Sequence, residues 1–262
     1  MTHAQKVATL IQAPRANAAR LLTRWLTITL FAVVPVSSTA ESSKRVLQIA
    51  VIDDVPSTRL ATQLLVTAYA TLGLRLDTTI VPSRRALLMA DQGLVDGDLF
   101  RIEEVASQYP DLVQVPYPLL QGRLMAVVAD PLADSLPAVN DRPLRVAVRR
   151  GVIIAEMTAD RLGMKTILAD NYQQMRALLD WGRVDLMLIS DIEELSPLAN
   201  SDWQDLGILP QPVTTFVLYH YLHKRHSDLA HDLAETLREM NENGVTLRIT
   251  NQARLEHTTA DR

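Results

Sequence analysis

The side chains best suited to binding chemistry in this sequence stand directly after short apolar segments. Most of these segments are rich in β-branched residues, as buried strands are. In sheets of parallel strands, ligands bind beyond the carboxyl ends of the strands, where helix amino termini also direct their N–H groups. The candidate ligand-binding residues that this rule selects are Asp53, Asp54, Ser83, Arg85, Arg101, Arg150, Gly151, Ser190 and Asp191.

Arg101 is the candidate on which most depends, because it follows the apolar pair Leu99 and Phe100. A guanidinium in a partly desolvated cleft can donate two parallel hydrogen bonds to a ligand carboxylate. The alternative is an ion pair with Glu103, Glu104 or another acidic neighbour. Tyr117 is a candidate stacking surface for the ligand, together with Tyr172 and Trp181, although core packing is the commoner role of such aromatic side chains.

Histidines and paired carboxylates are the other groups with chemical potential. Four histidines lie within twelve residues, at His220, His223, His226 and His231. In a strand, a spacing of three puts successive side chains on opposite faces, so we expect a solvated turn here and no metal site. The acidic pairs Asp53/Asp54, Glu103/Glu104 and Glu193/Glu194 are expected to complement helix dipoles rather than to transfer protons.

Catalytic motifs are missing from the sequence. It contains no Gly-x-Ser-x-Gly elbow, no phosphate-binding glycine loop, no His-Glu-x-x-His and no cysteine. We therefore expect a protein that is not an enzyme and that uses no cofactor and no metal.

The elements that carry the candidates alternate between strand and helix. Strands are predicted at residues 46–52, 75–81, 94–100 and 112–115, with helices at 56–72, 84–91 and 102–108, several of them ended by glycine. The pattern then restarts, with strands at 144–148, 165–168 and 184–189 and helices at 153–162, 172–181 and 193–199. Short connections between alternating elements indicate mainly parallel sheets covered on both faces.

The two halves also share short stretches of amino-acid sequence. The segment Arg85-Ala-Leu-Leu followed by Gly93-Leu-Val-Asp96 parallels Arg176-Ala-Leu-Leu followed by Gly182-Arg-Val-Asp185. Convergence of similar helix–glycine–strand units would explain this, but a duplicated α/β unit explains it better. Two long β-like stretches, 124–129 and 213–222, join the halves, and an amphipathic helix follows at 227–243.

This arrangement predicts an α/β protein with two lobes, each a mainly parallel sheet flanked by helices, joined by two crossing hinge segments. Residues 45–124 plus 218–257 are assigned to lobe one and residues 125–217 to lobe two. We expect two separate sheets with a wettable cleft between them that closes about the hinge.

Three stretches resemble the family 3 periplasmic solute-binding proteins, whose best-known members are amino-acid receptors of ABC importers. They are residues 46–52 with Gly93-Leu-Val-Asp96, the segment Leu144-Arg-Val-Ala-Val-Arg-Arg-Gly151, and the run from Tyr172 through Gly182-Arg-Val-Asp185 to Asn243-Gly244. The segment Val81-Pro-Ser-Arg-Arg-Ala-Leu87 resembles a divergent proteobacterial branch. The resemblance covers residues 45–250 and implies the type II periplasmic-binding-protein fold.

The resemblance also bears on single residues. Ser190 or Asp191 lies near the position of the family's ammonium-binding carboxylate, and Gly151 matches its carboxylate-contacting turn. Val152 and Ile153 replace the hydroxyl residues that the family has there, which argues against a standard α-amino-acid ligand. What the resemblance implies is capture of a small polar metabolite, anionic or zwitterionic, for an ABC importer. The alternative is a sensory or accessory module that reports ligand occupancy to a membrane signalling protein.

The amino terminus indicates export. Residues 1–40 contain four basic and no acidic side chains, a short apolar core and the small residues Val36 to Ala40, which is typical of a signal peptide cleaved after Ala40. An uncleaved anchor is the alternative. Removing these residues leaves 22 basic and 30 acidic side chains, a net charge of −8, so nucleic acid is not an expected partner. We expect a monomer in the periplasm that contacts a permease or a signalling protein.

Overall fold

A computed structural model describes residues 45–52, 56–138, 141–193, 195, 197–199 and 203–260. These residues belong to one compact unit of the chain. The predicted signal peptide and the candidates Asp53 and Asp54 lie outside the described residues. Within the described part, no helix is long and apolar enough to cross a membrane.

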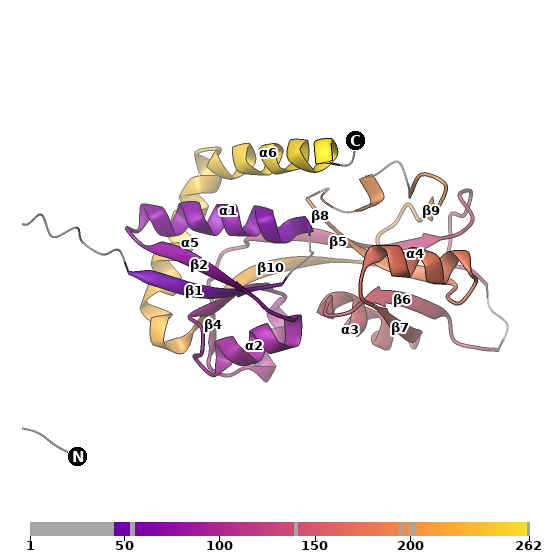
Figure 1. Ribbon diagram of the computed structural model, residues 1–262, viewed down its shortest axis with the longest axis horizontal. Coiled ribbons are helices and arrows are strands. Elements are labelled where there is room, and N and C mark those ends of the chain that lie inside the picture. The colour runs from indigo at the N-terminus through magenta and orange to yellow at the C-terminus, as the bar shows by residue number, and fades with distance from the viewer. Residues whose placement is uncertain are drawn as a thin grey trace, which may run out of the picture. The chain divides into compact units, whose positions relative to one another are not determined.

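The first lobe is built on three parallel strands in the order β2-β1-β3, which are β1 (Val46–Val51), β2 (Arg75–Ile80) and β3 (Gly97–Arg101). Helix α1 (Pro56–Thr71) and helix α2 (Ser83–Asp91) cover opposite faces of this sheet (Figure 1). The crossover from β1 to β2 and the crossover from β2 to β3 run in opposite directions along the sheet, and right-handed connections then require this placement. All five residues of β3 are buried, so the strand that carries Arg101 lies at the centre of the lobe.

The second lobe repeats the plan with β6 (Arg145–Arg149), β7 (Lys165–Ala169) and β8 (Leu186–Ile192), in the order β8-β6-β7. Side chains of β8 alternate between two hydrophobic clusters, because successive residues of a strand point to opposite faces. Leu186 and Leu188 pack in the cluster that holds α3 (Ile153–Arg161), whereas Met187 and Ile189 pack with α4 (Tyr172–Asp180). The lobe is therefore a sheet with one helix on each face.

Two antiparallel strands, β5 (Leu120–Val128) and β10 (Thr214–His223), connect the lobes (Figure 1). Strand β10 pairs with β5 over Thr214–Leu218 and with β3 over Tyr219–Leu222. Strand β5 in turn pairs with β8. The expectation of two separate sheets is wrong, because β10 belongs to both sheets and changes partner midway.

Short elements complete the sheets. Strand β4 (Leu112–Gln114) pairs with β10, and β9 (Gly207–Ile208) pairs with β5. The helices predicted at 102–108 and 193–199 are a 3₁₀ helix, η1 (Glu103–Gln108), and a single 3₁₀ turn, η2 (Pro197–Ala199), with Glu193 in a turn before it. Strand β3 begins at Gly97 rather than at residue 94, because residues 94–96 form the bend that follows α2.

The repeated Gly-x-Val-Asp sequence has the same structure in both lobes. Asp96 accepts a hydrogen bond from the backbone N–H of Gln48 in β1 at 2.7 Å, and its own N–H donates to the Gln48 carbonyl at 2.7 Å. Asp185 makes the same pair with Arg145 of β6, both at 2.8 Å. The two Arg-Ala-Leu-Leu segments do not occupy equivalent positions, because Arg85 precedes its glycine by eight residues and Arg176 precedes its glycine by six.

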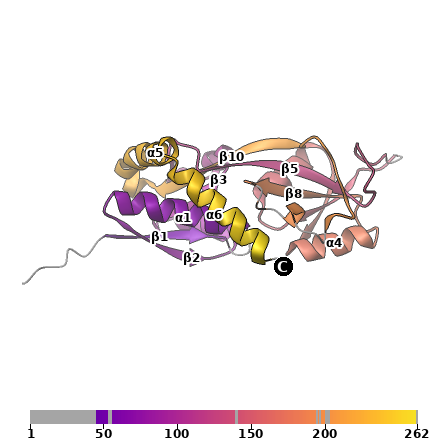
Figure 2. The same ribbon diagram turned by 90° about the horizontal axis from the view of Figure 1, so that it is seen from above.

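The carboxyl end forms two helices, α5 (Ser227–Glu242) and α6 (Val245–Ala260), after the 3₁₀ turn η4 (Lys224–His226). Helix α6 was not expected from the sequence. Figure 2 shows it lying across α1, and it packs on both α1 and α5. Arg254 of α6 donates to the carbonyl of Glu193 at 2.8 Å, so this helix also contacts the turn after β8.

Candidate functional site

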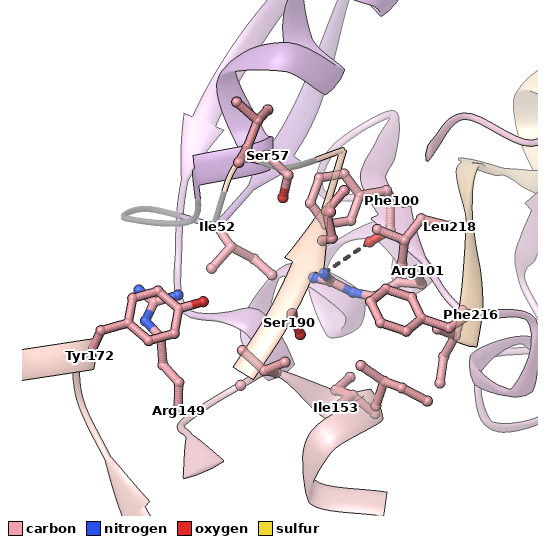
Figure 3. A pocket seen from close by; sticks show the side chains of 16 residues that line it. Ile52, Ser57, Phe100, Arg101, Arg149, Ile153, Tyr172, Ser190, Phe216 and Leu218 are labelled. Carbon is pink, nitrogen blue, oxygen red and sulfur yellow. Dashed lines mark hydrogen bonds between the residues drawn. The ribbon is translucent and has the colours of Figure 1, made fainter. Parts of the chain in front are cut away.

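A cavity of about 60 Å³ lies where the first lobe, the second lobe and the crossing strands meet (Figure 3). Residues from the ends of β1, β3, β6 and β8 surround it, as the strand-end rule predicts. Its sixteen lining residues are Ile52, Ser57, Phe100, Arg101, Ile102, Arg149, Gly151, Val152, Ile153, Ile154, Tyr172, Ser190, Ile192, Leu195, Phe216 and Leu218.

Arg101 lines this cavity and is only 5% exposed. Its Nη2 donates to Asp98 at 2.8 Å and to the Ser83 carbonyl at 3.2 Å, and its Nη1 donates to the Phe100 carbonyl at 3.0 Å. The acidic partner is therefore Asp98 of the same strand rather than Glu103 or Glu104. The Nε of Arg101 is buried without a hydrogen-bond partner.

Asp98 is completely buried behind Arg101. Burial raises the pKa of this carboxyl to about 6, against the opposing effect of the Arg101 guanidinium. One oxygen of Asp98 also has no hydrogen-bond partner. The pair is thus an arginine held in place by a carboxyl that can change its charge near neutral pH.

Two hydroxyl groups of the cavity wall are buried without partners. Ser57 is 1% exposed near the amino terminus of α1, and Ser190 is 9% exposed in β8. Neither Oγ makes a hydrogen bond in the structure. Buried hydroxyl groups almost always have a partner, so two such groups at one cavity indicate that a polar atom of a ligand or a water belongs there.

Arg149 and Tyr172 form the side of the cavity contributed by the second lobe (Figure 3). Arg149 is buried at the end of β6, and its Cζ lies 5.6 Å from the centre of the Tyr172 ring. This cation–π contact places the guanidinium over the face of the ring. The cavity therefore has one buried arginine from each lobe.

The lobes touch each other beside the cavity. Ser83 Oγ at the start of α2 donates to the Gly151 carbonyl at 2.9 Å, and Arg84 is ion-paired with Glu156 of α3 at 2.6 Å. Glu156 also accepts from the Gly151 N–H at 2.8 Å. These contacts close one edge of the cleft, which explains the small cavity volume.

The cleft is less polar than the sequence led us to expect. Ten of the sixteen lining residues are apolar, among them Ile102, Ile154 and Phe216. The expectation of a wettable gap is therefore wrong in part. Polar groups are present, but they are few and set into an aliphatic and aromatic wall.

Several predicted residues do not line this cavity. Arg85 and Arg150 are exposed, and Arg150 pairs with Asp170 at 3.0 Å. Asp191 points away from the cavity because it follows Ser190 in a strand, and it pairs with Arg123 at 2.6 Å. Tyr117 lies at a different hollow of about 220 Å³ beside α1 and α5, and Trp181 is 73% exposed.

A larger groove of about 600 Å³ lies along β5 and β10 and contains Asp191, Arg123 and Arg254. Four of its charged side chains are ion-paired with one another, in the pairs Arg123–Asp191 and Arg254–Glu193. The small cavity, and not this groove, combines the predicted residues Arg101, Gly151 and Ser190.

Two of the four histidines are more buried than the predicted solvated turn implies. His220 is fully buried, and its Nε2 shares a hydrogen bond of 2.8 Å with Tyr69 Oη. Burial lowers the pKa of His220 to about 4. His226 is also buried and lies 2.5 Å from Asp96. Among the described residues, no cluster of histidine and acidic side chains has the arrangement of a metal site.

Ser57 and the apolar wall were not selected from the sequence, whereas the strand-end rule points to Arg149 as well as to its neighbour Arg150. Ser57 could have been found, since it follows β1 at the same strand end as Asp53. The apolar residues carry no such signal, because a buried Ile or Phe in a wall looks the same in sequence as one in the core.

No protein-family model matches the chain. An uncharacterised protein of Shewanella oneidensis is 28% identical over 197 residues, which span 71% of this chain and 73% of that protein.

Solved structures match the fold closely. The ligand-binding core of GluR0 in complex with L-glutamate matches with a TM-score of 0.68 at 14% identity, over 80% of this chain and 98% of that one. The substrate-binding protein of an amino acid ABC transporter matches at 0.62 and 15%, over 79% and 98%. A histidine kinase sensor domain similar to periplasmic binding proteins matches at 0.65 and 14%, over 80% and 96%.

These comparisons confirm the predicted fold, the type II periplasmic-binding-protein fold. The similar structures are binding proteins and ligand-binding domains. One more, an ancestral amino-acid-binding protein with a TM-score of 0.63 and 17% identity over 79% of this chain and 94% of that one, is described as a precursor of cyclohexadienyl dehydratase.

Proposed function

We propose that this chain is a periplasmic substrate-binding protein that captures a small ligand between its two lobes for an ABC-type importer. The observation that carries the proposal is the set of buried polar groups that both lobes direct at one cavity. Arg101 and Ser57 come from the first lobe, and Arg149 and Ser190 from the second. Buried polar atoms without partners are costly, and a ligand that bridges the lobes would satisfy them.

The crossing strands supply the motion that such a protein needs. Strand β10 is shared between the lobes, so a change in its twist near Leu218 and Tyr219 would alter the angle between them. Ligand binding would then favour the conformation in which Ser83 contacts Gly151. The likeness to the substrate-binding protein of an amino acid ABC transporter supports this role.

A thermal unfolding screen of the purified protein against small metabolites tests the proposal. A ligand that binds only the native state at a hundred times its Kd stabilises it by about 2.7 kcal/mol, which moves the unfolding midpoint by several degrees. Native mass spectrometry of the secreted protein would reveal a co-purified ligand. It would also show whether the chain begins after Ala40. A screen in which no metabolite moves the midpoint would reject a binding role.

A sensory role is the second candidate, favoured by the likeness to a histidine kinase sensor domain. The two roles share a cavity and differ in partner. Neighbouring genes for a permease and an ATPase would favour import, and a neighbouring kinase or cyclic-dinucleotide enzyme would favour sensing. Stimulation of the permease's ATPase activity by the liganded protein distinguishes them directly.

Catalysis is not part of the proposal. The acidic pair Glu103 and Glu104 lines the groove along β5 and β10 instead of the cavity. We propose a monomeric periplasmic protein that needs no cofactor. Substrate turnover by the purified protein would contradict this.

A further inference from the structure

We infer that Phe216, whose ring lies against Gly122, sets the upper size limit for a ligand of the cavity, because it closes the cavity off from the groove along β5 and β10. This inference rests on the proposed binding function and names the residues that give it selectivity for size. Three observations lead to it: the residues that the two spaces share, the position of the Phe216 ring, and the volume of the cavity.

The cavity of about 60 Å³ and the groove of about 600 Å³ share part of their walls. Among the described residues, three line both spaces, namely Ile102, Ile154 and Phe216. Each of them is less than a tenth exposed. Side chains that border two spaces lie between them, so these three residues form an apolar partition between the cavity and the groove.

The partition is assembled from three parts of the molecule. Ile102 follows β3 in the first lobe, Ile154 belongs to α3 in the second lobe, and Phe216 lies in β10, which crosses between the lobes. Movement of the lobes about the crossing strands would separate Ile102 from Ile154. The partition is therefore complete only when the lobes are close together, and a ligand that extends through it opposes closure.

The Phe216 ring lies close to β5 because residue 122 has no side chain. Phe216 and Gly122 are opposite each other in the antiparallel pair of β10 and β5. A Cβ built on Gly122 would lie 2.5 Å from Cζ and 2.7 Å from Cε2 of Phe216, and 2.9 Å from Cγ1 of Ile192. Phe216 lines the cavity (Figure 3), as does Ile192, so the missing Cβ is on the face of the sheet that is turned to the cavity. Glycine in a strand often marks such a close approach.

Phe216 and Gly122 should therefore change the size limit in opposite directions when they are replaced. Removing the ring joins the cavity to the groove, and a longer ligand can then extend between Ile102 and Ile154. A methyl group at residue 122 pushes the ring away from β5 and into the cavity, which becomes smaller. A water needs about 10–15 Å³ of such volume, so 60 Å³ corresponds to about four to six non-hydrogen atoms.

Isothermal titration calorimetry with straight-chain carboxylates tests the inference, on protein that has been unfolded and refolded to remove any co-purified ligand. Acetate and butanoate fit the cavity volume, whereas octanoate exceeds it. The unmodified protein should bind butanoate at least about tenfold more tightly than octanoate. Competition by butanoate shows whether octanoate occupies the same cavity.

The two substitutions at Phe216 should extend the size limit. Phe216→Ala should bind octanoate at least about tenfold more tightly than the unmodified protein does, because the longer chain gains apolar contact in the opened space. Phe216→Leu should change the affinity for octanoate in the same direction by a smaller factor. This second variant keeps an apolar side chain in place and so tests the inference even if the alanine variant does not fold.

The substitution at Gly122 should shorten the size limit. Gly122→Ala should weaken butanoate binding by about tenfold and acetate binding by less, because the displaced ring takes up space that the longer chain needs. A crystal structure of this variant should show the Phe216 ring moved toward the cavity.

Val217→Ala is the matched control. Val217 follows Phe216 in β10, points to the other face of the strand and lines the groove. Its replacement should leave the ratio of the butanoate and octanoate affinities unchanged. The same change of this ratio in Val217→Ala and Phe216→Ala would show a general loosening of β10 and would overturn the inference.

The remaining outcomes separate the inference from the proposed function. An unchanged ratio in both Phe216 variants would overturn the inference, and so would the failure of every form of the protein to bind any of the three carboxylates. In both cases the binding role stands if the metabolite screen finds a ligand, and it falls if the screen finds none.

Discussion

At the scale of single residues, the pair formed by Asp98 and Arg101 links anion binding to pH. Burial raises the pKa of Asp98 to about 6, and Arg101 opposes this. Two neighbouring ionisable groups of β10, His220 and Tyr221, have pKa values that burial moves away from this range. Burial lowers the pKa of His220 to about 4 and raises the pKa of Tyr221 well above its ordinary value of 10.0. Of these three neighbouring groups, Asp98 is therefore the one whose charge can change between pH 5 and 8.

We predict that an anionic ligand bound beside Arg101 binds more tightly as the pH falls from 8 to 5.5. The bound anion places a second negative charge near Asp98 and raises the pKa of Asp98 further, so binding takes up a proton. The gain cannot exceed about tenfold per pH unit for one proton. Calorimetry in two buffers with different ionisation enthalpies measures the proton uptake. Asp98→Asn should abolish both effects, and a flat affinity in the unmodified protein would contradict the prediction.

The same proton changes the stability without ligand in the same direction. A carboxyl whose pKa is higher in the folded state than in the unfolded chain binds more protons when folded. Its contribution to the free energy of unfolding therefore falls as the pH rises from about 4 through 6.

Neighbouring residues show how far sequence could predict the site. The strand-end rule located the correct strand ends, since Arg101, Gly151 and Ser190 all reach the cavity. It could not choose between adjacent residues. Ser190 faces the cavity and Asp191 does not, because side chains of a strand alternate and the face that each takes depends on register. Arg149 and Arg150 differ in the same way.

At the scale of elements, the two Gly-x-Val-Asp units each tie a helix–turn segment to the first strand of their lobe. In the second lobe, Asp185 accepts from the Arg145 N–H at 2.8 Å and from the guanidinium groups of Arg142 and Arg145. Hydrogen bonds from Arg142 and then Arg145 hold the pKa of Asp185 well below its ordinary value of 3.8. The carboxylate thus extends the pairing between β6 and β8 by one residue, to Arg145.

We predict that Asp185→Asn lowers the free energy of unfolding by about 1–3 kcal/mol, because two guanidinium groups and a backbone N–H lose a charged acceptor. Because the folded-state pKa is depressed, the contribution is present above about pH 4 and is lost as the pH falls below it. Urea unfolding at pH 7 and at pH 3 measures both effects. Asp205→Asn, in an exposed pair with Arg176, is the control and should change little. Equal losses at both pH values would refute the argument.

Elements were predictable where apolar runs and glycine stops agreed. Strands β1, β6 and β7 and helices α1, α4 and α5 begin and end within one or two residues of the prediction. Helix α6 was missed because it begins directly after Gly244, which ends α5. Its signal was weak but present, since Val245, Ile249 and Ala253 repeat every four residues and pack on the core.

At the scale of the whole two-lobed unit, the contact between α2 and the turn after β6 joins the two lobes at one edge of the cavity. Gly151 has a φ of +85°, and a Cβ built on it would lie 2.7 Å from the Cβ of Ser83. That distance is shorter than real Cβ contacts, so a larger residue here must separate the lobes by a small amount. The neighbouring ion pair between Arg84 and Glu156 would lengthen with it. The two lobes can therefore come this close to each other only because residue 151 has no Cβ.

We predict that Gly151→Ala weakens ligand binding by about tenfold or more while both lobes remain folded. The replacement also carries a backbone penalty of about 1–2 kcal/mol at positive φ. Gly163→Ala is the matched control, because Gly163 has a φ of +65° and no atom within 4 Å of its Cβ position. Both variants should lose similar stability, and only Gly151→Ala should lose affinity. Small-angle X-ray scattering should show that ligand compacts the unmodified protein and the control more than Gly151→Ala. Equal affinities in the two variants would mean that binding does not require the lobes to meet at this edge.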